Sequence, residues 1–416
     1  MLQVTRNCNT AEWDNFVNQH PSGNILQLFA WAEAKLPAWD SEIVVLREEG
    51  KIIAGAQILF RQLPFPLQHF SMAYVPRGPV IDFTNSDLLS RLLHEIEIVA
   101  RQHHAISLTS DPLMLRQKAG SDFIAFWQKH GYIHAGFATD MREIQPRYNM
   151  VLDLTANNGN WRETISATCR SQINKAKRQA FVIRRQNPGD LQDFFAILQA
   201  TGERDHIGVR NRDYYEHIIH AFRSHGHENF SVIYLDKTAA LADWSEAQIK
   251  LQKEIEQNER RAAKANPLKQ QAILEDTNAR RQALARLQSD CRDLEKCSKN
   301  FVPLACAALL FCGKTCAYLY GGSAQEFRST MPVYGLLPAL IDAAKADGYT
   351  AFDFGGVSGC LDPQQDARYG GLYIFKKHWG AELTEYVGEF TKPLSPLIYK
   401  LFKFAVTFRK KIRGHS

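Results

Sequence analysis

The stretch Ala351-Phe-Asp-Phe-Gly-Gly-Val-Ser-Gly359 decides much of the fold, because a short apolar run in it passes directly into glycines. Its first half is expected to form a buried strand, and the glycines to form a turn that lets a ligand approach the backbone. A second block, Gly370-Gly-Leu-Tyr-Ile-Phe-Lys-Lys-His-Trp-Gly380, places Phe375, Lys376 and Lys377 after a hydrophobic run. Apolar packing can hold such a lysine with its ammonium in a cleft, where a cation stabilises developing negative charge.

The length and composition are those of a globular protein with more than one domain. The 416 residues exceed one ordinary core, and 45% hydrophobic with 23% charged residues is typical of soluble chains. The first residues carry no secretory signal and no apolar run reaches the roughly 20 residues of a membrane helix, so a cytoplasmic protein is expected. The eight cysteines lack the spacing of a zinc site, which favours reduced thiols and no metal.

The order of expected elements occurs twice along the chain. Residues 1–148 alternate helix-like and strand-like segments, and the order restarts at Tyr148. The later half includes an expected helix over 161–179 and a hairpin whose turn is Cys312-Gly313-Lys314. The sequence therefore predicts two tandem α/β units.

Residues 241–298 interrupt the second unit with a different composition, rich in Gln, Glu, Ala, Lys and Arg. Trp244, Leu251 and Asn258 recur every seven residues before a break at Asn266-Pro267, and Leu287 and Leu294 do so after it. This pattern predicts two antiparallel helices that form a coiled-coil arm on the order of 35–40 Å long. Because the seam is poor in large apolar residues, a structural or RNA-binding arm is favoured over a dimerisation coil.

The net charge of +6 is concentrated at the C-terminal end. Residues 391–416 contain seven Lys or Arg and no Asp or Glu, which leaves 50 − 7 = 43 basic against 44 acidic residues elsewhere. Apolar residues alternate with these charges in an amphipathic pattern: Leu397, Ile398, Leu401, Phe402, Phe404, Ala405 and Phe408. The helix suits an anionic membrane surface or RNA phosphates, or it docks on the protein by its apolar side; these interpretations are compatible.

A second basic segment lies between Glu163 and Asp190, where no acidic residue occurs. It fits contact with a nucleic-acid backbone, although a solvated helix face is the common alternative. Its basic residues are Arg170, Lys175, Lys177, Arg178, Arg184 and Arg185.

The quoted blocks, taken with Tyr318-Leu-Tyr-Gly-Gly-Ser323, Tyr74-Val-Pro-Arg-Gly-Pro-Val80 and Leu108-Thr-Ser-Asp-Pro112, resemble the FemABX family of peptidoglycan aminoacyltransferases. The resemblance covers nearly the whole chain. It implies an α/β (α+β) fold of two tandem GNAT-like acyltransferase domains with an inserted helical hairpin. The implied bounds are 1–148 completed by 391–416 for the first domain, 149–390 for the second, and 241–298 for the arm.

The resemblance also implies the reaction. An amino acid (Gly, Ala or Ser) would move from aminoacyl-tRNA to the stem-peptide lysine, or to a growing cross-bridge, of UDP-MurNAc-pentapeptide or lipid II. Because the aminoacyl ester is already activated, positioning of the reactants and a cation near the oxyanion suffice, with no cofactor besides the tRNA co-substrate.

The implied catalytic residues are Phe375 and Lys376, with Lys376 as the oxyanion stabiliser and Lys377 as its local competitor. Asp111 and Glu389 are the candidate bases, each with a structural alternative, and the proton also has routes through substrate or water.

The implied substrate-binding residues would contact the phosphates and sugar of the precursor. They are Lys35, Arg210, Tyr214 and Tyr320, with Arg212 as an alternative phosphate ligand because a guanidinium suits phosphate oxygens. Arg210 and Tyr214 are four residues apart, which would place them on one helix face.

Two other functional classes stay open at this point. A GNAT-like acyltransferase that uses acyl-CoA is one, although the chain has no recognisable pyrophosphate-binding loop. An RNA- or membrane-binding adaptor without activity is the other, and it would leave the Phe375-Lys376 block without a purpose.

Overall fold

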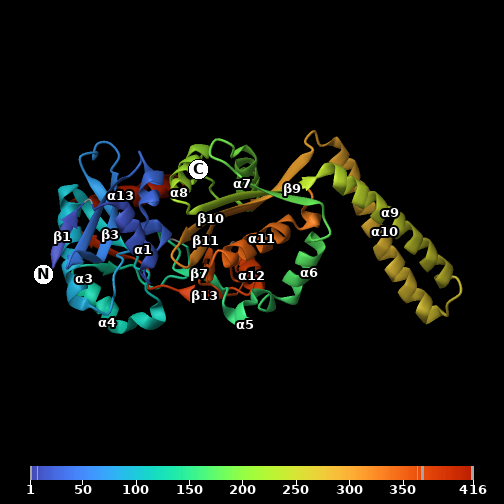
Figure 1. The fold of residues 1–416 in the computed structure, drawn as a ribbon, viewed down its shortest axis with the longest axis horizontal. Coiled ribbons are helices and arrows are strands. Elements are labelled where there is room, and N and C mark those ends of the chain that lie inside the picture. Colours follow the sequence, from blue (N-terminus) through green and yellow to red (C-terminus); the bar gives the residue numbers. More distant parts are fainter. Residues whose placement is uncertain (1, 7, 142, 363, 367–369, 414–416) are drawn as a thin grey trace.

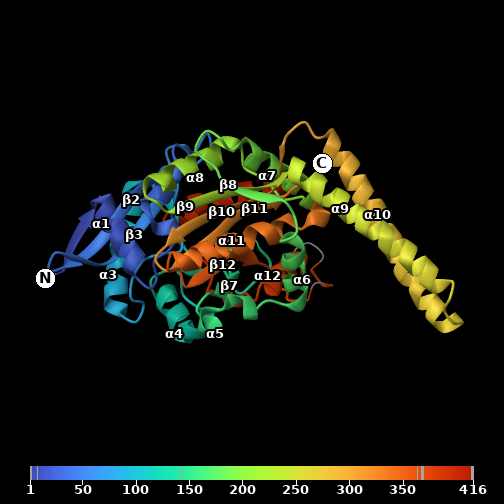
Figure 2. The same cartoon turned by 45° about the vertical axis from the view of Figure 1, so that its right-hand side comes forward.

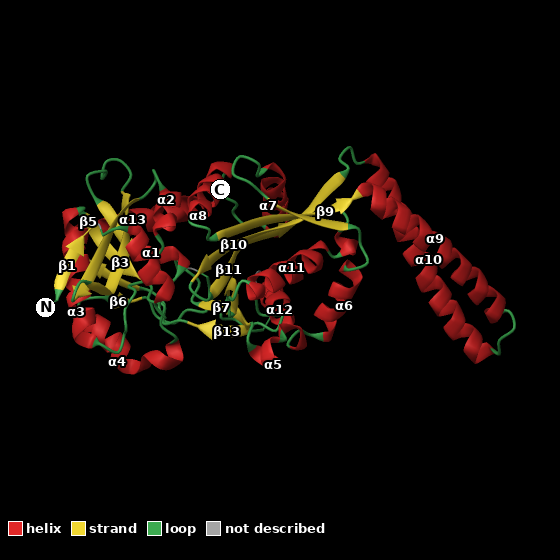
Figure 3. Ribbon diagram, viewed as in Figure 1, coloured by secondary structure: helices red, strands yellow, loops and turns green. Residues whose placement is uncertain are grey.

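The protein is described here from a computed structural model, which covers residues 2–6, 8–141, 143–362, 364–366 and 370–413, with side chains up to 406 in the last helix. Two seven-stranded sheets form the body, and a long helical arm projects from the second sheet (Figure 1, Figure 3). The predicted mixed α/β architecture of two tandem units is thereby confirmed.

The first unit contains a mixed sheet with helices on both faces. β4 and β5 are parallel, and the other pairs are antiparallel. In sheet order its strands are β1 (Gln3–Arg6), β2 (Asp40–Glu48), β3 (Lys51–Gln62), β4 (Ser71–Val75), β5 (Ala105–Ser110), β14 (Phe390–Pro393) and β6 (Ile133–His134). Its helices are α1 (Thr10–Gln19), α2 (Phe29–Lys35), α3 (Ser86–Gln102) and α4 (Arg116–Lys129).

The second unit repeats this plan. In sheet order its strands are β13 (Glu382–Glu385), β7 (Tyr148–Asp153), β12 (Ala351–Val357), β11 (Thr315–Ser323), β10 (Phe301–Cys312), β9 (Glu228–Asp236) and β8 (Phe181–Arg185). Its helices are α5 (Ala156–Gly159), α6 (Ala167–Ala176), α7 (Gln192–Asp205), α8 (Arg212–Ser224), α11 (Pro332–Ala346) and α12 (Gly370–His378).

Strand β10 is buried on both faces, as its nearly continuous apolar sequence requires. Cys306, Ala308 and Leu310 point toward α7 and α8, whereas the alternate residues Ala305 and Ala307 point toward α11. The β10–β11 hairpin closes at Cys312 and Thr315, as the sequence predicted.

The two units share one hydrophobic core, so they are packed together rather than merely tethered. The ring of Trp31 on α2 meets that of Phe222 on α8 edge-on, with centroids 6.4 Å apart. This contact fixes the first unit against the second beside the cleft described below.

The chain returns to the first unit at its end. β14 inserts between β5 and β6, and the last helix, α13 (Pro396–Arg413), packs against β5. Ile398 and Phe402 are half-buried on this helix. Leu397 and Leu401 form a separate apolar stripe that is 79% and 69% exposed. The helix therefore docks by one apolar face and leaves another open; Phe408, the last apolar residue of the predicted pattern, lies beyond the described side chains.

The arm consists of two antiparallel helices, α9 (Lys237–Ala262) and α10 (Pro267–Lys296), which project away from both sheets (Figure 1, Figure 2). Pro267 occupies the first turn of α10, and the Asn266 side chain caps that helix. The predicted seam is buried at Trp244 and Asn258, and Ile255 between them is buried as well. The Asn258 side chain donates to Asp276 of the other helix at 2.7 Å. The predicted hairpin is therefore present.

Two predicted elements are wrong in extent. The expected single helix over 161–179 is a 3-10 turn, Trp161–Glu163, followed by α6, because Ser166 caps a new helix by accepting from the Cys169 N–H at 3.1 Å. The segment 67–75 is also a candidate strand from its sequence, but β4 begins only at Ser71. Among the described residues, no helix is both long and apolar enough to cross a bilayer.

Candidate active site

A cleft of about 690 Å³ lies where the two units meet. The first unit contributes Lys35, Tyr74 and Arg77, and the second contributes two groups of residues. The first group is Arg210, Tyr214 and Tyr320, and the second is Asn149, Asp353, Gly355 and Gly356. The structure therefore brings together all four implied ligands of the precursor.

Lys35 lies at the end of α2 and is held by aromatic rings. Its ammonium lies 3.8 Å from the centre of the Trp31 ring and 4.4 Å from that of Tyr214. It donates to the Tyr214 hydroxyl at 2.6 Å, and that hydroxyl is 2.8 Å from the hydroxyl of Tyr320. Burial, and secondarily the charge of Arg210, lower the pKa of Lys35 to about 7.

Arg210 and Arg212 are separated by the start of α8. Arg210 precedes the helix, whose N-cap is Asn211, so the argument that it shares a helix face with Tyr214 is wrong. It nevertheless lines the cleft, with its guanidinium 5.7 Å from the Tyr214 ring centre. Arg212 does not line the cleft, because its guanidinium donates to Glu216 and to the Gly189 carbonyl.

Lys376 lies on α12, behind the glycine turn, which is an irregular bend at Gly355-Gly356 within β12 and not, as expected, the end of the strand. Gly355 has φ +76°, which favours glycine, and a β-carbon on Gly356 would lie 2.2 Å from Pro146. Lys376 is only 5% exposed, and its ammonium donates to the Gly356 carbonyl at 2.7 Å. Burial lowers the pKa of Lys376 to about 8 against the opposing effect of Asp353.

Phe375 and Lys377, the residues on either side of Lys376, have different surroundings from it. Phe375 packs edge-on against Tyr334 and Trp379, with ring centroids 6.3 Å apart in both pairs, and so anchors α12. Lys377 is exposed, and its ammonium lies 5.6 Å from the ring centre of Tyr373. Lys376, and not Lys377, is therefore the lysine that meets the glycine turn.

Asp111 and Glu389 lie behind Arg77 rather than in the wall of the cleft. Asp111 accepts from the Arg77 backbone N–H at 2.8 Å and holds that residue at φ +50°. Glu389 accepts from the Ile144 N–H. Burial raises the pKa of Asp111 to about 6 and that of Glu389 to about 7. Both groups titrate near neutrality, but any proton from the cleft would need an intermediary to reach them.

Several residues of the cleft were not singled out from the sequence, and Arg77, Asn149 and Asp353 are the ones that matter for its geometry. Arg77 lies inside the quoted Tyr74–Val80 motif, and its guanidinium donates to the Pro146 carbonyl at 2.6 Å. Asp353 could have been singled out from the sequence, because it is an acid within an otherwise apolar strand.

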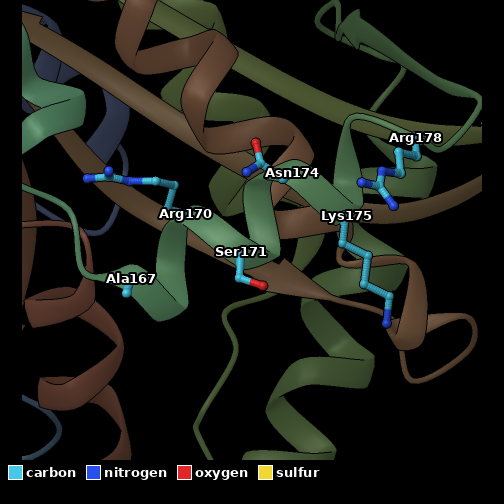
Figure 4. A pocket seen from close by; sticks show the side chains of 6 residues that line it. All are labelled: Ala167, Arg170, Ser171, Asn174, Lys175 and Arg178. Atoms are coloured by element: carbon cyan, nitrogen blue, oxygen red, sulfur yellow. The ribbon is translucent and has the colours of Figure 1, made fainter. Parts of the chain in front are cut away.

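The basic segment between Glu163 and Asp190 divides into two parts. Arg170, Lys175 and Arg178 line a surface hollow of about 720 Å³ and project from α6 and the turn that follows it (Figure 4). Arg185 instead pairs with the buried Glu228 at 2.6 Å, and the guanidinium of Arg184 lies 3.9 Å from the Phe301 ring centre. Helix α6 begins beside the end of α12, because the Ser166 N–H donates to the His378 carbonyl at 3.0 Å.

All the cysteines lie in the described part of the chain. They are free thiols, and most are buried. Within the described part of the chain, no group of three or more His, Cys, Asp or Glu side chains is placed to hold a metal ion.

Comparison with known proteins gives a consistent result. The model of the FemAB family matches residues 8–407. The chain is 31% identical over 403 residues to a lipid II:glycine glycyltransferase of Staphylococcus aureus (strain bovine RF122 / ET3-1), and the match covers 94% of this chain and 93% of that protein. It is 30% identical over 398 residues to the lipid II:glycine glycyltransferase of strain USA300, with the same coverage. The crystal structure of FemX superposes with a TM-score of 0.77 and 28% identity over 96% of this chain and 99% of that one. On this similarity along nearly its whole length, the chain belongs to the FemAB family.

Proposed function

We propose that the protein is an aminoacyltransferase that moves an amino acid from aminoacyl-tRNA to an amine of a peptidoglycan precursor. Glycine is the favoured donor and lipid II the favoured acceptor, because the full-length relatives are named lipid II:glycine glycyltransferases. The observation that carries the proposal is a single cleft that joins Lys35, Tyr214 and Tyr320 to the glycine turn in front of Lys376.

The reaction needs little covalent chemistry from the protein. The acceptor amine attacks the aminoacyl carbonyl carbon, a tetrahedral oxyanion forms, and the bond from that carbon to the ribose oxygen then breaks. The amine loses a proton and the ribose oxygen gains one, so the amide and the free tRNA hydroxyl are the products. The Lys376 ammonium has three N–H donors, one of which is engaged by Gly356, and the others are available to an oxyanion.

The precursor phosphates would bind at the opposite part of the cleft. Lys35 and Arg210 supply positive charge there, and the tyrosine hydroxyls supply neutral donors. Binding energy from this remote group would position the amine against the carbonyl, which is the main catalytic requirement of an activated ester.

The tRNA backbone would lie along α6. Arg170, Lys175 and Arg178 have no ion-pair partner among the described residues, so their charge is available to phosphates. Since α6 starts beside the end of α12, a tRNA held there would have its acceptor end near the helix that carries Lys376.

A lipid-linked acceptor would be met at the cytoplasmic face of the membrane. The open stripe of Leu397 and Leu401 on α13 lies in a segment with seven Lys or Arg and no acid. Apolar side chains beside lysines suit the headgroup region of an anionic bilayer, so we propose peripheral attachment through this stripe.

The test of the function is transfer of radiolabelled glycine, alanine or serine from charged tRNA to purified lipid II or UDP-MurNAc-pentapeptide. We expect transfer that ribonuclease abolishes, that prefers lipid II, and that falls by roughly 10²–10³ in kcat in Lys376→Met. The matched control is Lys377→Met, which removes an exposed ammonium from the same helix and should keep nearly full activity. Acyl transfer from acyl-CoA instead, or no transfer to either acceptor, would contradict the proposal.

A further inference from the structure

Asp353 is a half-buried acid within β12, and its carboxylate lines the cleft. Both oxygens are engaged: one accepts from the Gly355 N–H at 2.7 Å, and the other from the Asn149 side chain on β7 at 2.8 Å. Two donors from two strands fix the position of this carboxylate.

These contacts shape the glycine turn. The regular pairing of β12 with β7 is interrupted between Asp353 and Gly356, so this part of the strand bulges. The Asp353 carboxylate bridges the irregular part by binding Gly355, and the carbonyl of the next residue, Gly356, receives the Lys376 ammonium at 2.7 Å. The orientation of this carbonyl therefore depends on Asp353.

The geometry couples Asp353 to Lys376 across the glycine turn and not through a direct ion pair, because Asp353 binds the Gly355 N–H and Lys376 binds the Gly356 carbonyl. Among the described residues, Asp353 is the one whose charge acts on the pKa of Lys376, and it raises that pKa against the effect of burial. Arg77 and Lys376 face Asp353 from different elements, and both oppose the rise that burial causes in its own pKa. Tyr386 faces the same carboxylate and is uncharged, since burial raises its pKa to about 12. On α12 itself, Lys377 points to Tyr373.

We propose that Asp353 is the positioning residue of Lys376: its carboxylate builds the turn that receives the ammonium and keeps that ammonium charged inside a nearly dry site. The part concerning catalysis rests on the proposed function, whereas the coupling between the two side chains does not. A lysine is an effective oxyanion stabiliser only while protonated. Without Asp353, Lys376 would lose its proton at a lower pH, and activity would fall with it.

The experiment uses Asp353→Asn in the full chain, with two readouts. Competitive labelling with acetic anhydride, followed by mass spectrometry of the peptide that contains Lys376, gives the pH at which this amine becomes reactive. We expect that pH to fall by at least about one unit in the variant, because a nearby opposite charge typically shifts a pKa by 1–3 units. In the transfer assay, the alkaline limb of kcat should move to lower pH by the same amount, with a loss of about fivefold or more at pH 8 that approaches tenfold at higher pH and shrinks as the pH is lowered.

The reciprocal variant Asn149→Asp/Asp353→Asn restores one carboxylate and one amide to the same pair, and should recover most of the shift. Asp342→Asn is the matched control, because Asp342 pairs with Arg162 at the surface, and it should leave Lys376 unchanged. Thermal unfolding shows whether each variant is folded. If Asp353→Asn does not fold, the labelling of Lys376 in the reciprocal variant tests the proposal.

The outcomes separate the two proposals. Unchanged labelling of Lys376 in a folded Asp353→Asn protein would overturn the assignment, whatever the activity. A shifted labelling profile in a protein that transfers no amino acid would leave the coupling in place and reject the proposed function. Uniform loss of kcat at every pH, with labelling unshifted, would reduce Asp353 to a purely structural residue and also overturn the assignment.

Discussion

The ammonium of Lys35 and the hydroxyl of Tyr214 are 2.6 Å apart, although one belongs to α2 of the first unit and the other to α8 of the second. The contact continues to Tyr320 on β11, so three elements meet in one chain of polar groups. Because this arrangement forms only when the two units are packed together, substrate binding and the interface between the units are linked.

Tyr214→Phe should weaken binding of the precursor without changing the chemistry. The change removes the hydroxyl between Lys35 and Tyr320, and a hydrogen bond to a charged group is worth about 1.5–3 kcal/mol. We expect KM for the precursor to rise by roughly 10- to 100-fold with kcat little affected. Tyr349→Phe is the control, since this half-buried tyrosine stacks on Phe311 outside the cleft. An unchanged KM would show that Tyr214 does not contact the precursor.

Precursor affinity should depend on pH through Lys35. Its pKa of about 7 means that the ammonium predominates below pH 7 and the neutral amine above it. A phosphate ligand favours the ammonium, so the dissociation constant, measured by calorimetry, should fall as the pH is lowered from 8 to 6. Lys35→Arg keeps the charge throughout and should flatten the profile. A slope that persists in this variant would contradict the assignment of the pH dependence to Lys35.

The sequence predicted those elements whose apolar residues recur with a clear period or lie between strong turn signals. The arm and the β10–β11 hairpin are found where the pattern placed them, because the seven-residue repeat, the Asn266 cap and the glycine turn signal act locally. The pattern missed the start of α6, where Ser166 interrupts a run that keeps its helical character on both sides. The return of β14 to the first sheet is a long-range pairing that no local period encodes.

The candidate site was predicted through family motifs, and its physical details came from packing. The motifs identified Lys35, Tyr214, Tyr320 and Lys376, but no spacing in the sequence shows that the last is capped by the Gly356 carbonyl. By residue type alone, Arg212 is an equally plausible phosphate ligand and Asp111 an equally plausible base. Their partners, Glu216 and the Arg77 backbone, turn them away from the cleft, and only the folded chain shows such partners.

Charge on α6 should govern use of the tRNA. Lys175→Ala/Arg178→Ala removes two cations that have no described acidic partner, so kcat/KM for charged tRNA should fall about tenfold or more at physiological salt. The dependence of KM on salt should also become shallower by about two ions. Lys118→Ala/Lys129→Ala, two exposed lysines of α4 in the first unit, is the matched control for net charge. Equal loss in both double variants would indicate a general electrostatic effect and no α6 site.

The open stripe of α13 should attach the protein to anionic membranes. Leu401→Asp places a charge on a side chain that is 69% exposed, so folding should be unaffected while the insertion of the stripe into a headgroup layer is opposed. In sedimentation with phosphatidylglycerol-containing vesicles, we expect the bound fraction of the wild type to fall severalfold in the variant and to be low on purely zwitterionic vesicles. Leu268→Asp is the matched control, because Leu268 is 88% exposed at the start of α10 in the arm. Binding that survives Leu401→Asp, or that both variants lose equally, would contradict a role for this stripe.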